Sequence, residues 1–400
     1  MVSEKMLKFG GNSAIRAMFE EGKRMAKEFG PENVYDFSLG NPSVEAPSKV
    51  NETIIDLVKN EDSLKLHGYM PNPGYPEVRK KVADSLNSKY NTSFSAEDII
   101  MVVGAASGLN VVLKTILNPC DEVIVSAPYF MEYRSYVSNY DGKLISIPGL
   151  KGSFQLDLEA IEKSINKKTK AIILNSPNNP TGVIYTRESL EKLAEILRRK
   201  NAELGIDIVL VSDEPYRELS YDGYEVPFLT NIYENTIICY SFSKSLSLPG
   251  ERIGYLAVSD KIADREKLLE CLVVSHRILG SVNAPSLMQK VIERCIDIDI
   301  TPNVEIYDAN RKLLYNILIK AGFEPVYPAG AFYMWLKSPI ADKDFVDLCK
   351  KYRILVVPGS SFEGEGYVRV AYCVSKEMIE RSENSWFKVA EELGLKSKAE

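Results

Sequence analysis

Short apolar runs alternate along this chain with amphipathic stretches of helical spacing, and this alternation restricts the possible folds more than any other feature of the sequence. Six mostly apolar runs read as buried strands, at residues 123–126 (VIVS), 144–147 (LISI), 171–174 (AIIL), 206–211 (IDIVLV), 237–240 (IICY) and 255–258 (YLAV). Within residues 187–204, Leu190, Leu193 and Leu197 recur at spacings of three and four, which is typical of an amphipathic helix. This strand–helix–strand order predicts an α/β fold with a mostly parallel sheet covered on both faces.

The C-terminal part of the chain has a different pattern. Its expected elements are a long helical stretch over 284–321, the run FEPVYPAGAFYMWL, a helix near 342–352, the runs ILVVPG and YVRVAYC, and a terminal helix over 376–393. This mixture indicates a smaller α+β lobe, and 400 residues exceed what one simple core usually holds. The expected division is an N-terminal arm with part of the small domain (1–47), a large domain (48–295) and a small C-terminal domain (296–400).

The composition argues against several classes of protein. The net charge is −6 and the basic residues are scattered, so neither nucleic acid nor an anionic membrane is expected as a partner. The six cysteines lie far apart and there are only two histidines, so no metal site is expected, and isolated cysteines fit a reducing compartment. The sequence has no run of about 18 apolar residues and no signal-peptide core, which makes the cytoplasm the expected location.

Polar motifs follow the predicted strands, where ligands bind in open α/β sheets. They are GAASGLN (104–110), NSPNNPTG (175–182), SDEPYREL (212–219) and SFSKSLSLPGERIG (241–254). GAASGLN opens a helical pattern, so its exposed N–H groups and the helix dipole favour an anion, although it is not the GxGxxG dinucleotide motif. Taken singly, each motif has an ordinary structural explanation: Asp213 could cap a helix and Lys244 could be a surface lysine. Their joint occurrence at successive strand ends favours a functional site.

In this order the motifs resemble those of class I/II aminotransferases, which are pyridoxal 5′-phosphate (PLP) enzymes of fold type I similar to aspartate aminotransferase. The matching motifs extend from Gly40 to Arg369 and cover nearly the whole chain. NPTG, the following DE–Y and SFSK…R are specific to this group. The resemblance implies the aspartate aminotransferase fold, in which a large PLP-binding domain with a mostly parallel, seven-stranded-type sheet is joined to a smaller α+β domain.

The resemblance also assigns roles around the cofactor ring. Lys244 resembles the lysine that forms a Schiff base with PLP and then moves a proton as general acid and base. Its ordinary pKa, near 10.4, would have to be lowered by burial and by neighbouring cations. Asp213 resembles the acid that pairs with the pyridine nitrogen, and Tyr216 and Asn179 resemble the partners of the ring hydroxyl O3′. Phe130 matches the ring that stacks on the pyridine, although ordinary core packing would also explain it.

The phosphate of the cofactor needs several donors. Ser241, Ser243 and Arg252 match the family's phosphate site, where an arginine offers a two-pronged contact and hydroxyls add directional hydrogen bonds. The backbone of Ala105 and Ala106 should complete the site at the helix start. Family members often carry a polar side chain near Ala106, so a backbone contact is expected here.

Three further residues resemble family positions outside this core. Arg369 and Gly40 match the groups that bind the α-carboxylate of the substrate, through the guanidinium and a backbone N–H, and Asn179 is expected to bind the substrate with them. Tyr69 resembles the tyrosine that reaches the phosphate in the neighbouring subunit, which implies a homodimer with a shared active site. A loop tyrosine without a ligand is the alternative for Tyr69.

The implied activity is a PLP-dependent aminotransferase that moves an amino group between an L-amino acid, aspartate or another common one, and a 2-oxo acid such as 2-oxoglutarate. A C–S β-lyase or a decarboxylase would use the same lysine, aspartate and phosphate site, so both stay open as alternatives. A non-catalytic PLP-binding sensor is a further alternative, which the negative net charge does not favour. Arg277 and Arg16 are candidate contacts for a side-chain carboxylate, and Arg277 reads at least as well as a solvated helix residue.

Overall fold

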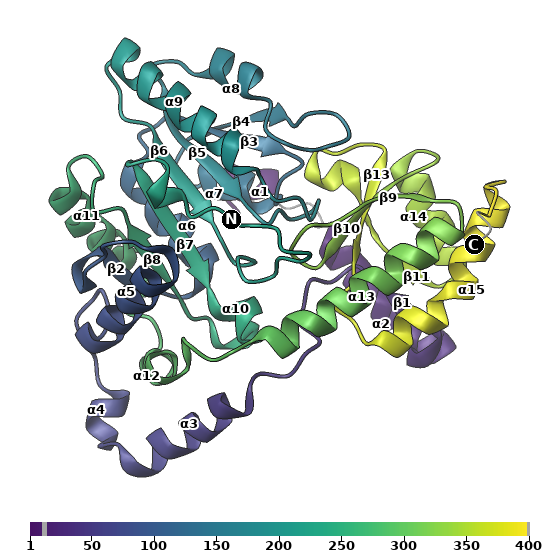
Figure 1. Ribbon diagram of the computed structural model, residues 1–400, viewed down its shortest axis with the longest axis horizontal. Coiled ribbons are helices and arrows are strands. Elements are labelled where there is room, and N and C mark those ends of the chain that lie inside the picture. Colours follow the sequence, from purple (N-terminus) through teal and green to yellow (C-terminus); the bar gives the residue numbers. More distant parts are fainter. Residues whose placement is uncertain (10–13, 398–400) are drawn as a thin grey trace.

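The computed structural model describes residues 1–9 and 14–397, which form a large and a small lobe. In Figure 1 the large lobe lies on the left and the small lobe on the right, and the long helix α13 (Thr301–Lys320) leads into the small lobe. No helix in the described part of the chain has the length and apolar character needed to cross a membrane.

The large lobe is built on a seven-stranded sheet. Its strands, in spatial order, are β2 (Ile99–Val102), β8 (Gly254–Val258), β7 (Thr236–Ser241), β6 (Val209–Asp213), β5 (Thr169–Asn175), β3 (Glu122–Ala127) and β4 (Lys143–Pro148). Only β8 runs antiparallel to its neighbours, β2 and β7, and the other strand pairs are parallel. The predicted mostly parallel α/β sheet is therefore confirmed.

Both faces of this sheet are buried. Successive side chains of a strand point to opposite sides, and here each set lies in an apolar cluster of its own. In β7, Ile238 and Tyr240 belong to one apolar cluster, whereas Ile237 and Cys239 belong to another. The first face is covered by α5 (Pro76–Tyr90), α8 (Leu158–Ser164), α9 (Arg187–Leu204) and α12 (Ser286–Cys295), with α3 (Ser48–Asn60) and α4 (Ser63–His67) at its margin. The second is covered by α6 (Gly104–Ile116), α7 (Glu132–Ser138) and α11 (Arg265–Ile278).

The small lobe contains a four-stranded antiparallel sheet and a two-stranded parallel one. The larger sheet has the order β12 (Val357–Pro358), β13 (Tyr367–Ala371), β10 (Tyr333–Lys337), β9 (Glu324–Val326), and β1 (Tyr35–Asp36) pairs with β11 (Ile354–Leu355). Helices α2 (Ala14–Phe29), α13, α14 (Asp342–Lys351) and α15 (Lys376–Glu392) pack around them. The N-terminal segment thus joins the C-terminal part of the chain, and the exact domain borders stay a prediction.

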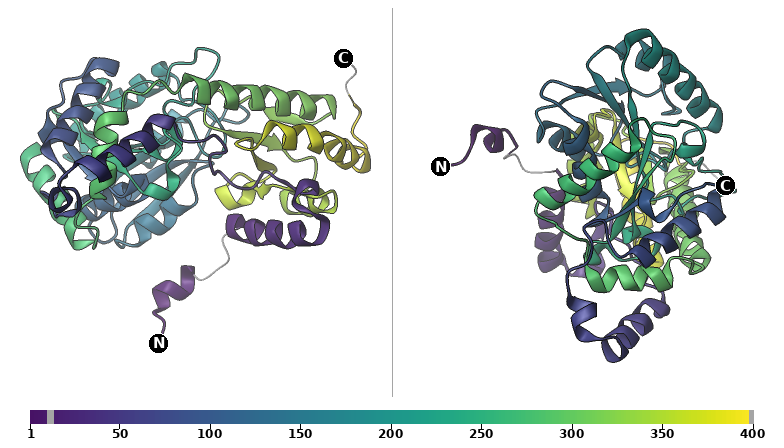
Figure 2. Two further views of the ribbon diagram at one scale, coloured as in Figure 1. Left: turned by 90° about the horizontal axis from the view of Figure 1, so that it is seen from below. Right: turned by 90° about the vertical axis from the view of Figure 1, so that its left-hand side faces the viewer.

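The first helix, α1 (Glu4–Phe9), stands off the body of the molecule, as both views in Figure 2 show. Its Lys5 donates a hydrogen bond to the Asp141 carboxylate at 3.0 Å and another to the backbone carbonyl of Asn139 at 3.2 Å. These exposed contacts join α1 to the turn that follows α7.

The single long helix expected over 284–321 was wrong. The structure has two helices there, α12 and α13, separated by residues 296–300. Pro302 lies in the first turn of α13, and the carboxylate of Asp299 accepts a hydrogen bond from the N–H of Thr301. A proline lacks the N–H of an inner helical residue and disfavours helical geometry in the residue before it, so the helix starts anew at this point. At this break the chain passes from the large lobe into the small one.

Candidate active site

One pocket, of about 300 Å³, lies at the carboxyl ends of the central strands and reaches the small lobe. It brings together every predicted site residue except Tyr69: Gly40, Ala105, Ala106, Phe130, Asn179, Asp213, Tyr216, Ser241, Ser243, Lys244, Arg252 and Arg369. These residues span more than 300 positions of sequence, so only the folded chain assembles them.

Lys244 lies on α10 (Phe242–Ser245), the single helical turn that follows β7. Its Nζ donates a hydrogen bond to the backbone carbonyl of Gly40 at 2.7 Å. The pKa of Lys244 is lowered to about 8, first by burial and then by the positive charges of Arg369 and Arg252, against an opposing contribution from Cys373. A larger fraction of this amine is therefore neutral at pH 7 than for an exposed lysine, which makes it a better nucleophile and base.

Asp213 is the last residue of β6 and is buried. Its Oδ2 accepts a hydrogen bond from the Tyr133 hydroxyl at 2.5 Å, whereas its Oδ1 has no partner among the described residues. The pKa of Asp213 is raised to about 7, chiefly by burial and also by the Glu214 charge, whereas the hydrogen bond from Tyr133 lowers it. Asn175 donates to the Asp213 carbonyl at 2.8 Å and so fixes the end of the strand. An unpartnered, buried carboxylate oxygen is suited to receive a proton donor such as a protonated ring nitrogen.

The start of α6 and the β7–α10 turn form a cradle for an anion. The hydroxyls of Ser241 and Ser243 lie 2.7 Å apart, and Arg252 lies against Gly104. A Cβ on Gly104 would come within 2.8 Å of Arg252 Nη2, so glycine is needed for this approach, and its φ of +74° also favours glycine. Hydroxyls, a guanidinium and free N–H groups at a helix start are the donors that a phosphate requires. The residues present therefore fit the phosphate of PLP.

Arg369 lies on β13 of the small lobe, where an alternating strand would normally point such a residue to solvent. The structure buries it, with 2% of its surface exposed. Its Nη1 donates to Asn179 Oδ1 at 3.0 Å and its Nη2 donates to the Ser38 carbonyl at 2.7 Å. The guanidinium also lies 4.4 Å from the centre of the Tyr333 ring. Each of these nitrogens keeps a second N–H, and Nε has no partner among the described residues, so donors remain for a carboxylate.

Two tyrosines of the site were missed by the sequence analysis. Tyr333 lines the pocket, and its hydroxyl lies 3.0 Å from that of Tyr216. The backbone of Gly40 packs so closely on Tyr333 that a Cβ would lie 1.9 Å from the hydroxyl. Tyr133 holds Asp213, and its position three residues after Phe130 was the only sequence signal for it.

The other predicted residues have different surroundings. The Phe130 ring meets the Tyr133 ring edge to face at 5.6 Å. Tyr69 is 93% exposed in the loop after α4, and Arg277 is exposed on the last turn of α11; neither lines the pocket. The side chain of Arg16 lies outside the described residues.

Known proteins share both the sequence pattern and the fold. The family model described as aminotransferase class I and II matches residues 32–382. The probable aspartate aminotransferase of Methanocaldococcus jannaschii is 32% identical over 387 residues, covering 92% of this chain and 95% of the relative. The aromatic-amino-acid aminotransferase 2 of Thermococcus litoralis is 28% identical over 399 residues, covering 96% and 97%.

Solved structures agree. An aminotransferase from Eubacterium rectale is 43% identical, with a TM-score of 0.94 over 98% of this chain and 99% of that one. The aspartate aminotransferase of Thermus thermophilus with maleate is 26% identical, with a TM-score of 0.86 over 97% and 99%. This chain belongs to the aminotransferase class I and II family and is a transaminase.

Proposed function

We propose that this chain binds PLP in the pocket at the strand ends and uses it to transfer an amino group from an L-amino acid to a 2-oxo acid. The observation that carries the proposal is the pairing of two groups in one pocket: the Lys244 amine and the unpartnered Oδ1 of Asp213. Two arginines, Arg252 and Arg369, line the same pocket, one for each anionic group of the bound molecules.

The large lobe would hold the cofactor. Arg252, the hydroxyls of Ser241 and Ser243, and the N–H groups at Ala105 and Ala106 are the donors for its phosphate. Phe130 would cover one face of the ring, and Lys244 would bind it covalently. When bound, PLP supplies the electron sink that makes loss of the Cα proton feasible and carries the amino group between substrates.

The residues of this chain would then orient the reactants and move the proton. Arg369 would bind the α-carboxylate of the substrate, with the backbone N–H of Gly40 beside it. Lys244 Nζ, as a free amine, would take the proton from Cα of the substrate and deliver it to C4′ of the cofactor. Asp213 would keep the ring nitrogen protonated, and Tyr216 and Asn179 would donate to the ring hydroxyl. The burial of Arg369 and Asp213 supports a site from which water is largely excluded.

The proposed donor is aspartate or another common amino acid, with 2-oxoglutarate as acceptor. Relatives named for aspartate and for aromatic amino acids support this range. Arg277 is the candidate that would favour aspartate, by binding its side-chain carboxylate from a partner subunit. If it does, Arg277→Ala should slow turnover of aspartate and leave turnover of an aromatic donor unchanged.

We also propose a cytoplasmic homodimer in which Tyr69 reaches the phosphate site of the partner. Exposed apolar side chains on α3 and α4, Ile55, Val58 and Leu64, support a covered surface near this loop. Asn283 donates to the carbonyl of Pro71 at 3.1 Å, which holds the Tyr69 loop against the segment after α11. The six free cysteines fit a reducing compartment.

An absorbance spectrum of the purified protein tests the proposal. With PLP added, a band of lysine-bound cofactor should shift when aspartate is added and return with 2-oxoglutarate. Lys244→Ala should lose this band and nearly all turnover, yet keep some PLP through the phosphate site. Release of pyruvate and ammonia from cystine without any 2-oxo acid would instead indicate the β-lyase.

A further inference from the structure

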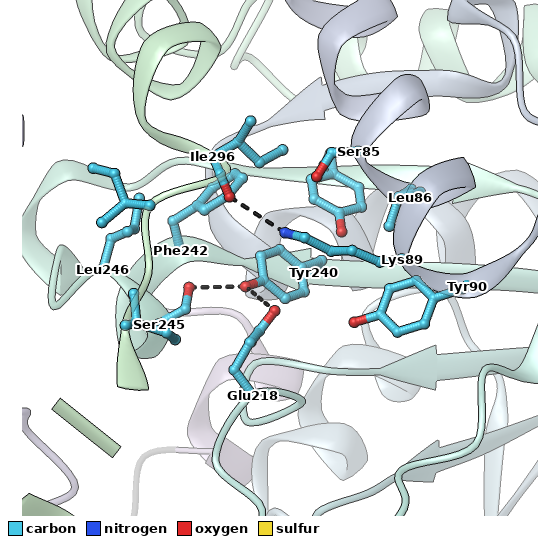
Figure 3. Close-up of a pocket in the computed structure, with 13 residues that line it drawn as sticks. Ser85, Leu86, Lys89, Tyr90, Glu218, Tyr240, Phe242, Ser245, Leu246 and Ile296 are labelled. Carbon is cyan, nitrogen blue, oxygen red and sulfur yellow. Dashed lines mark hydrogen bonds between the residues drawn. The ribbon is translucent and has the colours of Figure 1, made fainter. Parts of the chain in front are cut away.

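A second cavity, of about 60 Å³, lies behind the helical turn that carries Lys244 (Figure 3). It is bounded by α5, by the ends of β7 and β8, by α10, and by residues 296–300, which link the lobes. Its lining residues are Ser85, Leu86, Lys89, Tyr90, Glu218, Tyr240, Phe242, Ser245, Leu246, Tyr255, Ile296, Ile298 and Ile300. From α10, Phe242 and Ser245 line this cavity, whereas Ser243 and Lys244 line the active-site pocket. The two pockets therefore lie on either side of α10.

Glu218, Tyr240 and Ser245, which all line this cavity, form a chain of hydrogen bonds. The Tyr240 hydroxyl lies 2.8 Å from Glu218 Oε1 and 2.8 Å from Ser245 Oγ, as Figure 3 shows. A phenol has one hydrogen, so when Glu218 is ionised Ser245 donates to Tyr240 and Tyr240 donates to the carboxylate. Burial raises the pKa of Glu218, and its Oε2 has no partner among the described residues. The chain is therefore a buried network whose members depend on one another.

The two ends of this chain are attached to the active site. Ser245 directly follows Lys244, and Glu218 lies two residues after Tyr216. Helix α10 has only four residues, and a single turn is not stable without outside contacts. Ser241 caps the turn from the front, by accepting a hydrogen bond from the N–H of Ser243 at 3.2 Å. On the opposite side of the turn, Tyr240 is hydrogen-bonded to Ser245 and Glu218 is hydrogen-bonded to Tyr240.

We propose that Tyr240 and Glu218 are positioning residues for Lys244: through Ser245, their hydrogen bonds hold α10 so that the lysine amine faces the cofactor. This inference rests on the proposed PLP chemistry and adds to it a support that touches neither cofactor nor substrate. The ring of Tyr240 is further fixed by stacking on Tyr255, with the ring centres 4.8 Å apart.

The test compares Tyr240→Phe with Tyr255→Phe. Both variants keep a ring in the same cavity and lose one hydroxyl, but only Tyr240→Phe breaks the chain. Loss of the buried bonds should raise the dissociation constant of PLP about ten-fold in Tyr240→Phe. The pH midpoint for incorporation of PLP into the protein should also move upward, because an α10 that is no longer held leaves the lysine amine less buried. Tyr255→Phe should match the wild type in both measurements.

Variants at the two ends of the hydrogen-bond chain test whether the effect of Tyr240→Phe comes from the broken chain or from a folding defect. Ser245→Ala should reproduce the effect of Tyr240→Phe, and the double variant should be no worse than either, because each removes the same connection. Ser245→Thr and Glu218→Gln keep a hydroxyl and an acceptor oxygen, and should retain most of the affinity.

The outcomes separate this inference from the proposed function. If the wild type forms no lysine-bound PLP, both fail. If the wild type forms it, and Tyr240→Phe and Ser245→Ala bind PLP and titrate like the wild type, the positioning role alone is wrong. Equal weakening by Tyr240→Phe and Tyr255→Phe would also overturn it, since a general packing defect would then explain the loss.

Discussion

The amine of Lys244 lies in a pocket with two guanidinium groups, so its titration is a direct test of its surroundings. Burial first, and then Arg369 and Arg252, lower the pKa of Lys244 to about 8. The neutral amine attacks the aldehyde, so the rate of PLP incorporation should rise with pH and level off above about 8. Stopped-flow absorbance from pH 6 to pH 10 measures this. A rate still rising steeply at pH 10 would show that the lysine titrates like an exposed one.

Tyr133→Phe should weaken the chemistry without emptying the pocket. The change removes the 2.5 Å hydrogen bond to Asp213 Oδ2, which helps to keep the carboxylate ionised. The pKa of Asp213 should therefore rise above about 7, and kcat at pH 7 should fall about ten-fold or more. Tyr129→Phe is the matched control, since the Tyr129 hydroxyl bonds to Glu363 and lies outside the pocket lining. Equal kcat values for the two variants would contradict the role.

At this scale the sequence revealed the residues that carry family motifs and missed their partners. Lys244, Asp213 and Arg369 could be named because each lies in a recognisable pattern. The contacts of Tyr133 with Asp213 and of Tyr333 with Tyr216 join residues 80 and 117 positions apart. No local spacing encodes such contacts, because they depend on how the strands and lobes pack.

Among the elements, the start of α6 is where the backbone conformation bears most directly on the proposed phosphate site. Gly104→Ala places a Cβ against Arg252 Nη2 and imposes a left-handed conformation on alanine. We expect a loss of unfolding free energy of about 1 kcal/mol from the backbone strain, and a PLP dissociation constant raised about ten-fold or more. Urea unfolding and a PLP titration measure the two effects.

The C-terminal end of α9 offers the control. Gly205 has a φ of +66° but no atom near its Cβ position, so Gly205→Ala adds strain of the same kind far from the pocket. It should lose similar stability and keep normal PLP affinity. If both variants bound PLP equally well, the cradle at Gly104 would not serve the phosphate.

The elements themselves differed in how far the sequence defined them. Helix α9 was expected over residues 187–204 and has those bounds, because Thr186 caps its start and Gly205 ends it in a left-handed conformation. The break between α12 and α13 was missed, because apolar residues continue at helical spacing on both sides. The alternation IDIDI at residues 296–300 and the backbone effect of Pro302 marked it, and neither shows in a count of apolar residues.

For the molecule as a whole, His276 makes stability depend on pH. It is buried on α11, neither ring nitrogen has a partner among the described residues, and burial lowers its pKa. Below pH 6.5, the usual pKa of histidine, this imidazole is protonated in the unfolded chain, whereas in the folded chain it stays neutral to a lower pH. The stability contributed by this residue is therefore lost as pH falls from 7 to 5. Asp213, with a raised pKa, acts in the opposite direction, so variants must be compared with the wild type.

His276→Leu removes the group, and an apolar residue in its place leaves no unpaired polar atom. Between pH 7 and pH 5 the variant should gain on the order of 1 kcal/mol relative to the wild type in urea unfolding at one protein concentration. His67→Leu, which removes an exposed histidine instead, is the matched control for the loss of an imidazole. A parallel slope for wild type and His276→Leu would rule out this contribution.

The groups proposed for the chemistry and the group proposed to recognise the substrate belong to different lobes. Lys244 and Asp213 are fixed by the large sheet, whereas Arg369 comes from a small sheet more than a hundred residues later. Substitutions can therefore alter the chemistry or the binding of the substrate separately. Because every amino-acid donor carries an α-carboxylate, Arg369 can hold any of them, and substitutions elsewhere in the pocket that change the choice of donor need not disturb the amine and the carboxylate proposed to perform the reaction. A family of enzymes with this arrangement can change its amino-acid donor during evolution while it keeps the same reacting groups.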